Sequence, residues 1–345
     1  MMGSLKWVWL LFLLTLPVWM TNQYYLHVLI GTGIFTVAAM SLNLLLGFTG
    51  QLSLGHVAFF GIGGYTSALL SLGFDLHITD SYTFVCPSQP VWLAFLAGIA
   101  VAGVFGWFIG RISFKVRGAY FVIVTISFAQ VVRLVALNWI DLTEGPMALN
   151  NIPPFSLALP GFGEFAFYKK LPNYYLVLGI CLVSYLVVRR LVHSRTGRAF
   201  IALRENENLA ESVGVNVTRF LVLAAVVSAA MAGAAGCLYT HYIRIIDPDV
   251  FLFIYTVTMV IMVVTGGKGT LAGPVVGGII FGILPEILRE VAGPEVQWII
   301  YGVIMILILF FLPQGIVPAL RSWWEGRRPQ EAVSAGARAG GGNGS

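Results

Sequence analysis

Long apolar stretches follow one another along almost the whole chain, separated by short polar interruptions. Most of these stretches are close in length to the about 20 residues that an α-helix needs to cross the hydrocarbon core of a bilayer. They lack the alternation of a membrane β-barrel, and only helices or closed barrels satisfy every backbone group in lipid. The pattern predicts an all-α polytopic membrane protein with about ten transmembrane helices. The candidate helices cover residues 5–20, 24–46, 52–72, 91–112, 119–139, 174–191, 220–242, 251–264, 271–288 and 296–312.

Composition supports the same class. Hydrophobic residues make up 58% of the 345 residues and charged residues only 10%, against roughly 25% in a soluble domain. The net charge of +5 comes from residues beside the apolar runs, so it does not indicate nucleic-acid binding. The three cysteines lack metal-ligand spacing, and neither a metal site nor a disulfide framework is predicted.

Basic residues set the expected orientation. With both termini in the cytoplasm, 15 of the 20 basic residues fall on the inner side, a strong bias under the positive-inside rule. The remaining five are Arg133, Lys169, Lys170, Arg244 and Arg289. The first apolar run has no small-residue cleavage site, which favours an uncleaved span over a signal peptide.

The chain is predicted to form one transmembrane domain over residues 1–320. Residues 321–345 are rich in Gly, Ala, Ser and Arg, and are expected to be a disordered cytoplasmic tail. The outer loop 140–173 contains five prolines, so an ordered cap rather than a helix is expected there.

One charged segment, residues 189–219, interrupts the apolar pattern and must lie in water at a membrane face. It holds six arginines and three glutamates. Ser194 or Thr196 can cap a short helix that runs to Arg204, and a second short helix is expected to end at Gly214.

Phe200, Ile201 and Leu203 supply an apolar side to this charged segment. Such a helix can lie on anionic lipid. The mixture of arginine and glutamate instead favours docking into a groove of a soluble partner. The residues predicted to form this coupling surface are Arg195, Arg198, Arg204, Glu205, Asn206 and Glu207.

Two glycine-rich segments, residues 47–56 and 266–274, interrupt apolar runs near opposite ends of the chain. Paired interruptions point to broken helices that line a transport site, where Thr49, Gln51 and Ser53 can bind a zwitterion. Alternatively, both are tight inner-surface turns at which helices pack through small residues. The pattern leaves both interpretations open.

Isolated polar residues in the apolar runs also have two interpretations. For His56, a packing or hydrogen-bonding role is favoured over a proton or metal role. Arg133 is expected to reach the outer surface by snorkelling. The alternative is that it attracts a substrate carboxylate, with Gln130 one turn away.

The chain lacks the residues for its own energy source. Gly267-Lys268-Gly269 is not a P-loop, because no Ser or Thr follows the lysine. ATP and its magnesium are therefore expected on other subunits, with no cofactor and no enzymatic activity in this chain. The predicted spans also lack the acidic pairs and nucleophile–base sets that mark proton-coupled carriers and intramembrane hydrolases.

Four segments, taken in order along the chain, resemble segments of the permeases of ABC importers for branched-chain amino acids, LivM type. They are residues 41–65 (SLNLLLGFTGQLSLGHVAFFGIGGY), 129–139 (AQVVRLVALNW), 197–207 (GRAFIALRENE) with 212–215 (SVGV), and 266–277 (GGKGTLAGPVVG). The resemblance extends over roughly residues 24–316. Asn43, Gln51, Ser53 and His56 match the family's glycine-rich segment, and Arg133 matches its outer-helix arginine. Together with Thr49 and Gln130, these are the residues predicted to line the substrate path.

The resemblance implies a multi-pass subunit of the bacterial inner membrane that translocates leucine, isoleucine or valine. The implied partners are a second, LivH-type permease, two ABC ATPase subunits and a periplasmic binding protein, with residues 197–207 contacting an ATPase. Residues 143–146 read TEGP where many relatives have a T-G-G type turn. Urea or short-chain amide permeases are the near alternative, and a self-sufficient channel or ion-coupled carrier is the alternative from another class.

Overall fold

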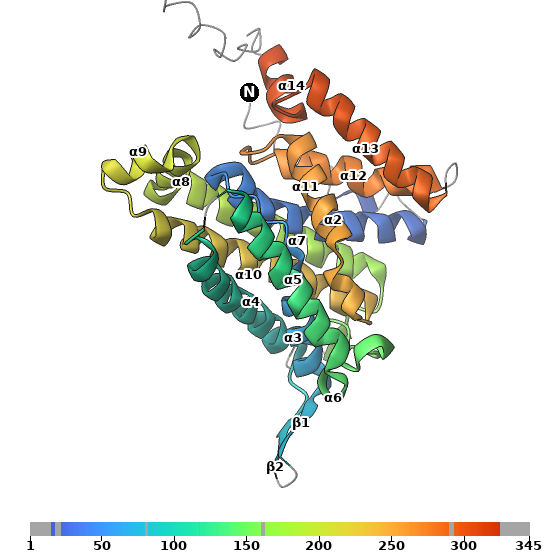
Figure 1. The fold of residues 1–345 in the computed structure, drawn as a ribbon. Coiled ribbons are helices and arrows are strands. Elements are labelled where there is room, and N and C mark those ends of the chain that lie inside the picture. Colours follow the sequence, from blue (N-terminus) through green and yellow to red (C-terminus); the bar gives the residue numbers. More distant parts are fainter. Residues whose placement is uncertain are drawn as a thin grey trace, which may run out of the picture.

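The computed structural model describes residues 15–17, 22–79, 82–116, 118–159, 163–289 and 293–324. Within these ranges the chain folds into helices that run back and forth between two faces of the molecule (Figure 1). One face, which we name the inner face, carries η1 (Leu44–Thr49), α8 (Arg195–Glu205), α9 (Glu207–Ser212), α14 (Ile316–Trp324) and the turns that follow residues 113 and 266. The opposite face, which we name the outer face, carries α6 (Ile140–Thr143), the end of α10 (Val217–Ile243) and two hairpins, β1–β2 (Phe74–Thr79 and Tyr82–Cys86) and β3–β4 (Ser156–Leu159 and Gly163–Ala166). The first predicted helix, 5–20, lies almost entirely outside the described residues.

Among the residues that the structure describes, five helical stretches are long and apolar enough to cross a membrane. They are α2 with its continuation η1 (Gln23–Thr49), α4 (Val91–Ser113), α5 (Ala119–Asn138), α7 (Lys170–Val192) and α10 (Val217–Ile243). Shorter apolar helices are α3 (Val57–Leu72), α11 (Phe253–Gly266), α12 (Gly273–Arg289) and α13 (Pro294–Phe311). The polytopic helical prediction is confirmed, whereas the total of about ten spans stays a prediction.

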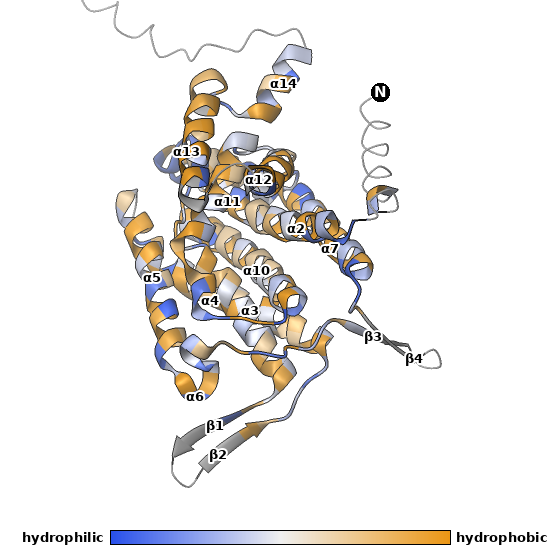
Figure 2. Cartoon of the chain, turned by 90° about the vertical axis from the view of Figure 1, so that its right-hand side faces the viewer, coloured by the Kyte–Doolittle hydropathy of each residue, from blue (hydrophilic) through white to orange (hydrophobic). Residues whose placement is uncertain are grey.

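The long helices divide into a centre and a periphery. The most apolar windows of α2 and α10 are each 78% buried, against 22% for α5 and 17% for α7. α10 packs against α3, α4 and α2, while α2 also contacts α7, α11 and α12. Figure 2 shows apolar residues along most of this bundle. The exposed apolar sides of α5 and α7 therefore suit contact with lipid or another membrane subunit.

Glycine allows the central helices to approach closely. A Cβ atom at Gly236 of α10 would collide with the carbonyl oxygen of Phe60 in α3. Cys237 fills the next position and is fully buried. Contacts between helix backbones of this kind replace the hydrophobic driving force that is missing between helices in lipid.

The outer loops contain short strands that correct the prediction of an all-α chain. β1 (Phe74–Thr79) pairs antiparallel with β2 (Tyr82–Cys86), and β3 (Ser156–Leu159) pairs antiparallel with β4 (Gly163–Ala166). The first hairpin is rich in aromatic and β-branched residues, which favour strands. Both hairpins project beyond the helical bundle (Figure 2), so the helical core is unaffected.

In its described residues, the outer loop between α5 and α7 is a cap built of short helical turns and strands. Besides the β3–β4 hairpin it contains α6 (Ile140–Thr143) and η2 (Gly145–Met147). Its backbone exchanges hydrogen bonds between Leu149 and Ile246, which follows α10. Arg244 Nε donates to the carbonyl oxygen of Ile152 at 3.1 Å. The cap is therefore fastened to the outer end of α10.

A short helix crosses the predicted boundary at residue 320, and the domain division itself stays a prediction. α14 (Ile316–Trp324) continues four residues beyond residue 320, so residues 321–324 are helical. The rest of the predicted tail lies outside the described residues. The side chains of Trp323 and Trp324 are 79% and 78% exposed.

Candidate functional site

The charged segment forms two short helices with side-chain caps at each start. They are α8 (Arg195–Glu205) and α9 (Glu207–Ser212). Ser194 Oγ accepts hydrogen bonds from the backbone nitrogens of Thr196 and Gly197, and Asn206 Oδ1 accepts from Leu209 at 3.0 Å. Gly214 adopts φ +90°, which ends the segment as predicted. These caps confirm the expected pair of helices.

α8 is packed firmly on the membrane domain. Phe200 and Leu203 are 0% and 1% exposed, and the Phe200 ring meets Phe220 of α10. Ile201 was expected on the same apolar side but is 38% exposed. The correction follows from helical geometry, since Ile201 lies about 100° around the helix from Phe200.

The polar side of α8 contacts the first glycine-rich segment. Arg204 Nη1 donates to the carbonyl oxygen of Gly47 at 3.0 Å, and its other nitrogens pair with Glu205. Gln51 Nε2 donates to Glu207 Oε1 at 2.6 Å. Gly50, with φ +76°, reverses the chain so that Gln51 can reach this point. Two predicted coupling residues thus contact the first glycine-rich segment, and one of them, Glu207, bonds the predicted path residue Gln51.

Asn43 joins the two glycine-rich segments. Its Nδ2 donates to the carbonyl oxygen of Thr270 at 2.9 Å, and its Oδ1 accepts from the backbone nitrogen of Gly269 at 3.0 Å. The side chain is 1% exposed. The sequence paired the two segments as glycine-rich interruptions of apolar runs, but it did not predict that they touch.

The segment between Gly50 and α3 descends into the protein without forming a helix. His56 is fully buried, and its Nε2 lies 2.7 Å from Ser41 Oγ. Ser41 is about two helical turns before the end of η1. A Cβ atom at Gly55 would collide with the carbonyl oxygen of Thr125 in α5. Non-helical backbone at this depth is tolerated because it is enclosed by protein.

This arrangement explains why α3 begins at residue 57 rather than at the predicted residue 52. Ser53 is also buried, at 2% exposure, and Thr49 is 1% exposed with its hydroxyl donating to Leu45. Among the described residues, His56 Nδ1 has no hydrogen-bond partner. The first glycine-rich segment therefore combines an inner-face turn with a buried, interrupted entry into α3.

The two path residues predicted on α5 lie apart from this cluster. Arg133 Nη2 pairs with Asp249 Oδ1 at 2.8 Å, in η3 (Pro248–Phe251) at the opposite face. The Arg133 side chain is only 28% exposed, so it is a bridge between elements rather than a freely snorkelling group. Gln130 is half-buried one turn away. The pairing with Asp249 had no signal in the sequence.

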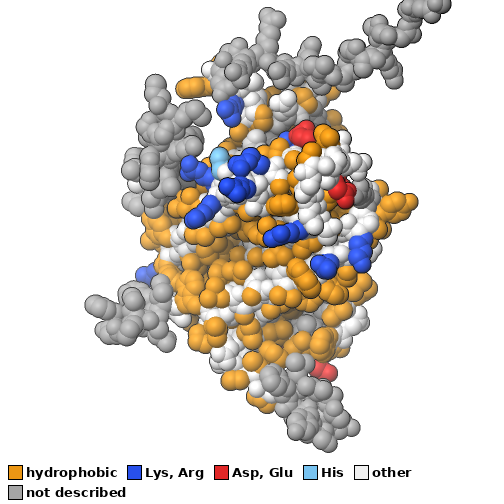
Figure 3. Space-filling model, turned by 90° about the vertical axis from the view of Figure 1, so that its left-hand side faces the viewer, with side chains coloured by type: hydrophobic (Ala, Val, Ile, Leu, Met, Phe, Trp, Pro, Cys, Tyr) orange, Lys and Arg blue, Asp and Glu red, His pale blue; other side chains and the backbone are white. Residues whose placement is uncertain are grey.

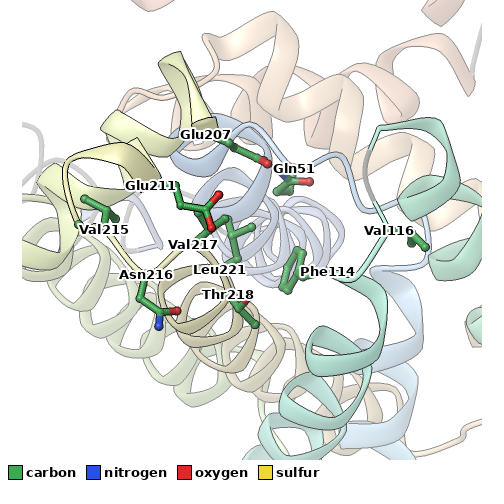
Figure 4. A pocket seen from close by; sticks show the side chains of 11 residues that line it. Gln51, Phe114, Val116, Glu207, Glu211, Val215, Asn216, Val217, Thr218 and Leu221 are labelled. Atoms are coloured by element: carbon green, nitrogen blue, oxygen red, sulfur yellow. Dashed lines mark hydrogen bonds between the residues drawn. The ribbon is translucent and has the colours of Figure 1, made fainter. Parts of the chain in front are cut away.

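A cavity of about 370 Å³ opens beside the Gln51–Glu207 contact. Figure 4 shows Glu207 and Glu211 on one side of the cavity, with Gln51 and Phe114 lying across from Glu211. The other residues that line it are Val116, Gly214, Val215, Asn216, Val217, Thr218 and Leu221. Sequence reasoning missed Phe114 and Val116, because only the tertiary fold brings the α4–α5 turn to the charged segment.

Comparison with known proteins identifies the family. A model of the family "Branched-chain amino acid transport system / permease component" matches residues 24–309. The chain belongs to this family. The match contains nearly all of α2 through most of α13, including Asn43, Arg133, α8 and α9. The resemblance inferred from the four sequence segments is thus confirmed.

Curated permeases align with most of the chain. The high-affinity branched-chain amino acid transport system permease protein LivM of Salmonella typhimurium is 30% identical over 309 residues, covering 84% of this chain and 69% of the relative. LivM of Escherichia coli K12 gives the same figures. LivH of Salmonella typhimurium is 27% identical over 301 residues, covering 82% of this chain and 91% of the relative. No solved structure matches the permease.

Proposed function

We propose that this permease is one membrane subunit of an ABC importer that translocates leucine, isoleucine and valine across the bacterial inner membrane. A LivH-type permease pairs with it, two ATPase subunits bind its inner face, and a periplasmic binding protein delivers substrate to the outer face. The family match over residues 24–309 carries this proposal. LivM and LivH relatives both align with the chain, which supports a pair of homologous permeases.

The distribution of basic residues supports a cytoplasmic inner face and a cytoplasmic C-terminus. Figure 3 shows Lys and Arg side chains concentrated toward one end of the molecule, with apolar surface below them. Exposed members of this group are Arg111, Lys115, Arg189, Arg190, Arg195, Arg198, Arg219 and Lys268. Such a concentration is typical of the cytoplasmic side.

The attachment of α8 supports its role as the element that an ATPase moves. Its buried residues fix it to α10, and Arg204 ties it to the end of α2. Meanwhile Arg195 and Arg198 remain exposed for contact with a partner. A rigidly packed helix transmits displacement, whereas a loose loop absorbs it.

A transport assay tests this proposal. The complete importer is reconstituted in vesicles with labelled leucine, and unlabelled isoleucine, valine and urea compete in separate samples. Uptake should require ATP and an active partner ATPase, and isoleucine and valine should compete while urea should not. Uptake by the permease alone would refute the importer assignment, and competition by urea alone would refute the substrate assignment.

A further inference from the structure

Three segments far apart in the sequence meet at one junction on the inner face. Arg204 of α8 donates to Gly47, and Asn43 bonds both Gly269 and Thr270. We call these five residues the inner junction. It connects α8 to the end of α2, and the end of α2 to the α11–α12 turn.

The inner junction has almost no free space. A Cβ atom at Gly47 would collide with the backbone nitrogen of Gly269. A Cβ atom at Gly269 would lie 2.7 Å from Arg204 Nη1 and 2.8 Å from the carbonyl oxygen of Gly47. Because the three segments touch through backbone atoms and one guanidinium group, none of them can slide past another without breaking hydrogen bonds. Packed contacts of this kind shift between discrete arrangements rather than deform smoothly.

The element that Arg204 contacts is unusual. α2 ends in a π-helix, Leu44–Thr49, and Gly47 lies in its middle. The last carbonyl groups of a helix lack a partner within the helix, and Arg204 supplies the donor for one of them. π-helical turns are rare and occur frequently at functional sites. The end of α2 is therefore a natural place for a local change in helical register.

We propose that Arg204 is a positioning residue that transmits displacement of α8 to the π-helical end of α2 and, through Asn43, to the α11–α12 turn. This proposal rests on the proposed importer function. Arg198 and Arg204 are both exposed, but Arg204 donates to the carbonyl oxygen of Gly47, so the proposal assigns its guanidinium group to a contact within this chain and Arg198 to contact with the ATPase. Displacement of α8 then moves three helices at once, because the inner junction holds them together.

A pair of variants on α8 tests the assignment in the assembled importer. Arg204→Met keeps the side-chain stem over Gly50 but removes the hydrogen bonds, and Arg198→Met is the matched control. Arg204→Met should lower uptake per ATP hydrolysed by about tenfold, the effect expected when the hydrogen bond from its charged guanidinium group to Gly47 is lost. Arg198→Met should instead lower the amount of ATPase that copurifies.

Normal uptake per ATP in Arg204→Met would overturn the proposal, and so would loss of ATPase binding matching that of Arg198→Met. If the native importer shows no ATP-dependent uptake, the proposed function itself fails. These outcomes are distinguishable because the native complex is measured in the same experiment.

A second measurement applies even if Arg204→Met does not assemble. Spin labels are placed at Ile201 and Lys268, after replacement of the three native cysteines, in an importer with Arg204 intact. ATP binding should leave the distance between these labels unchanged, while the distance from Ile201 to a label at Met147 on the outer face should change. A change between Ile201 and Lys268 would show that α8 moves independently of the α11–α12 turn and would refute the proposal.

Discussion

Replacing Asn43 with alanine removes the side chain that joins the two glycine-rich segments by hydrogen bonds. The variant leaves the backbone N–H of Gly269 and the carbonyl oxygen of Thr270 without their partner. An unsatisfied buried polar group costs about 1–3 kcal/mol, and both groups are half-buried, so we expect a total loss of about 2–4 kcal/mol in the free energy of unfolding.

The matched control is Asn150→Ala in the outer loop. Asn150 Nδ2 also donates to two carbonyl oxygens, those of Met147 and Ala148, but its side chain is exposed. Water can replace those bonds, so this variant should stay within about 0.5 kcal/mol of the native protein. Both free energies are measured by unfolding the purified permease in mixed micelles. Equal losses for the two variants would refute the inner junction as a stabilising contact.

Three further predictions follow from other contacts. Gly236→Ala should lower the free energy of unfolding by about 1–3 kcal/mol, because the added methyl group collides with α3. Gly179→Ala, in the open part of α7, should raise it by about 0.5–1 kcal/mol. If unfolding in mixed micelles gives the opposite order of stability, the packing described here is contradicted. Gly55→Leu should abolish leucine uptake, because its side chain collides with the α5 backbone; normal uptake would show that the backbones can separate there. Arg133→Gln should change uptake less than about fivefold, because its pair with Asp249 is partly exposed and worth at most about 1 kcal/mol; a larger loss in a transport assay would instead favour a role in substrate attraction.

The local chemistry of the sequence determined the class of this protein and much of its secondary structure. Apolar run length predicted the helical, membrane-spanning character, since the cost of placing residues in lipid is summed over one contiguous segment. The helix cap at Ser194 and the helix end near Gly214 were also predicted from the sequence, because such signals depend only on residues a few positions away. The family resemblance also came from segments recognisable one by one.

Only the tertiary structure decided what the candidate site residues touch. Asn43 bonds a residue 227 positions away, and no periodicity indicates which helices become neighbours. Gln51, which is predicted to line a path, bonds Glu207, and Arg133 pairs with Asp249 116 positions away. Hydrogen bonds have short range and strict geometry. Which groups satisfy them depends on how all the helices pack together, so these pairings follow from the three-dimensional fold rather than from any local pattern.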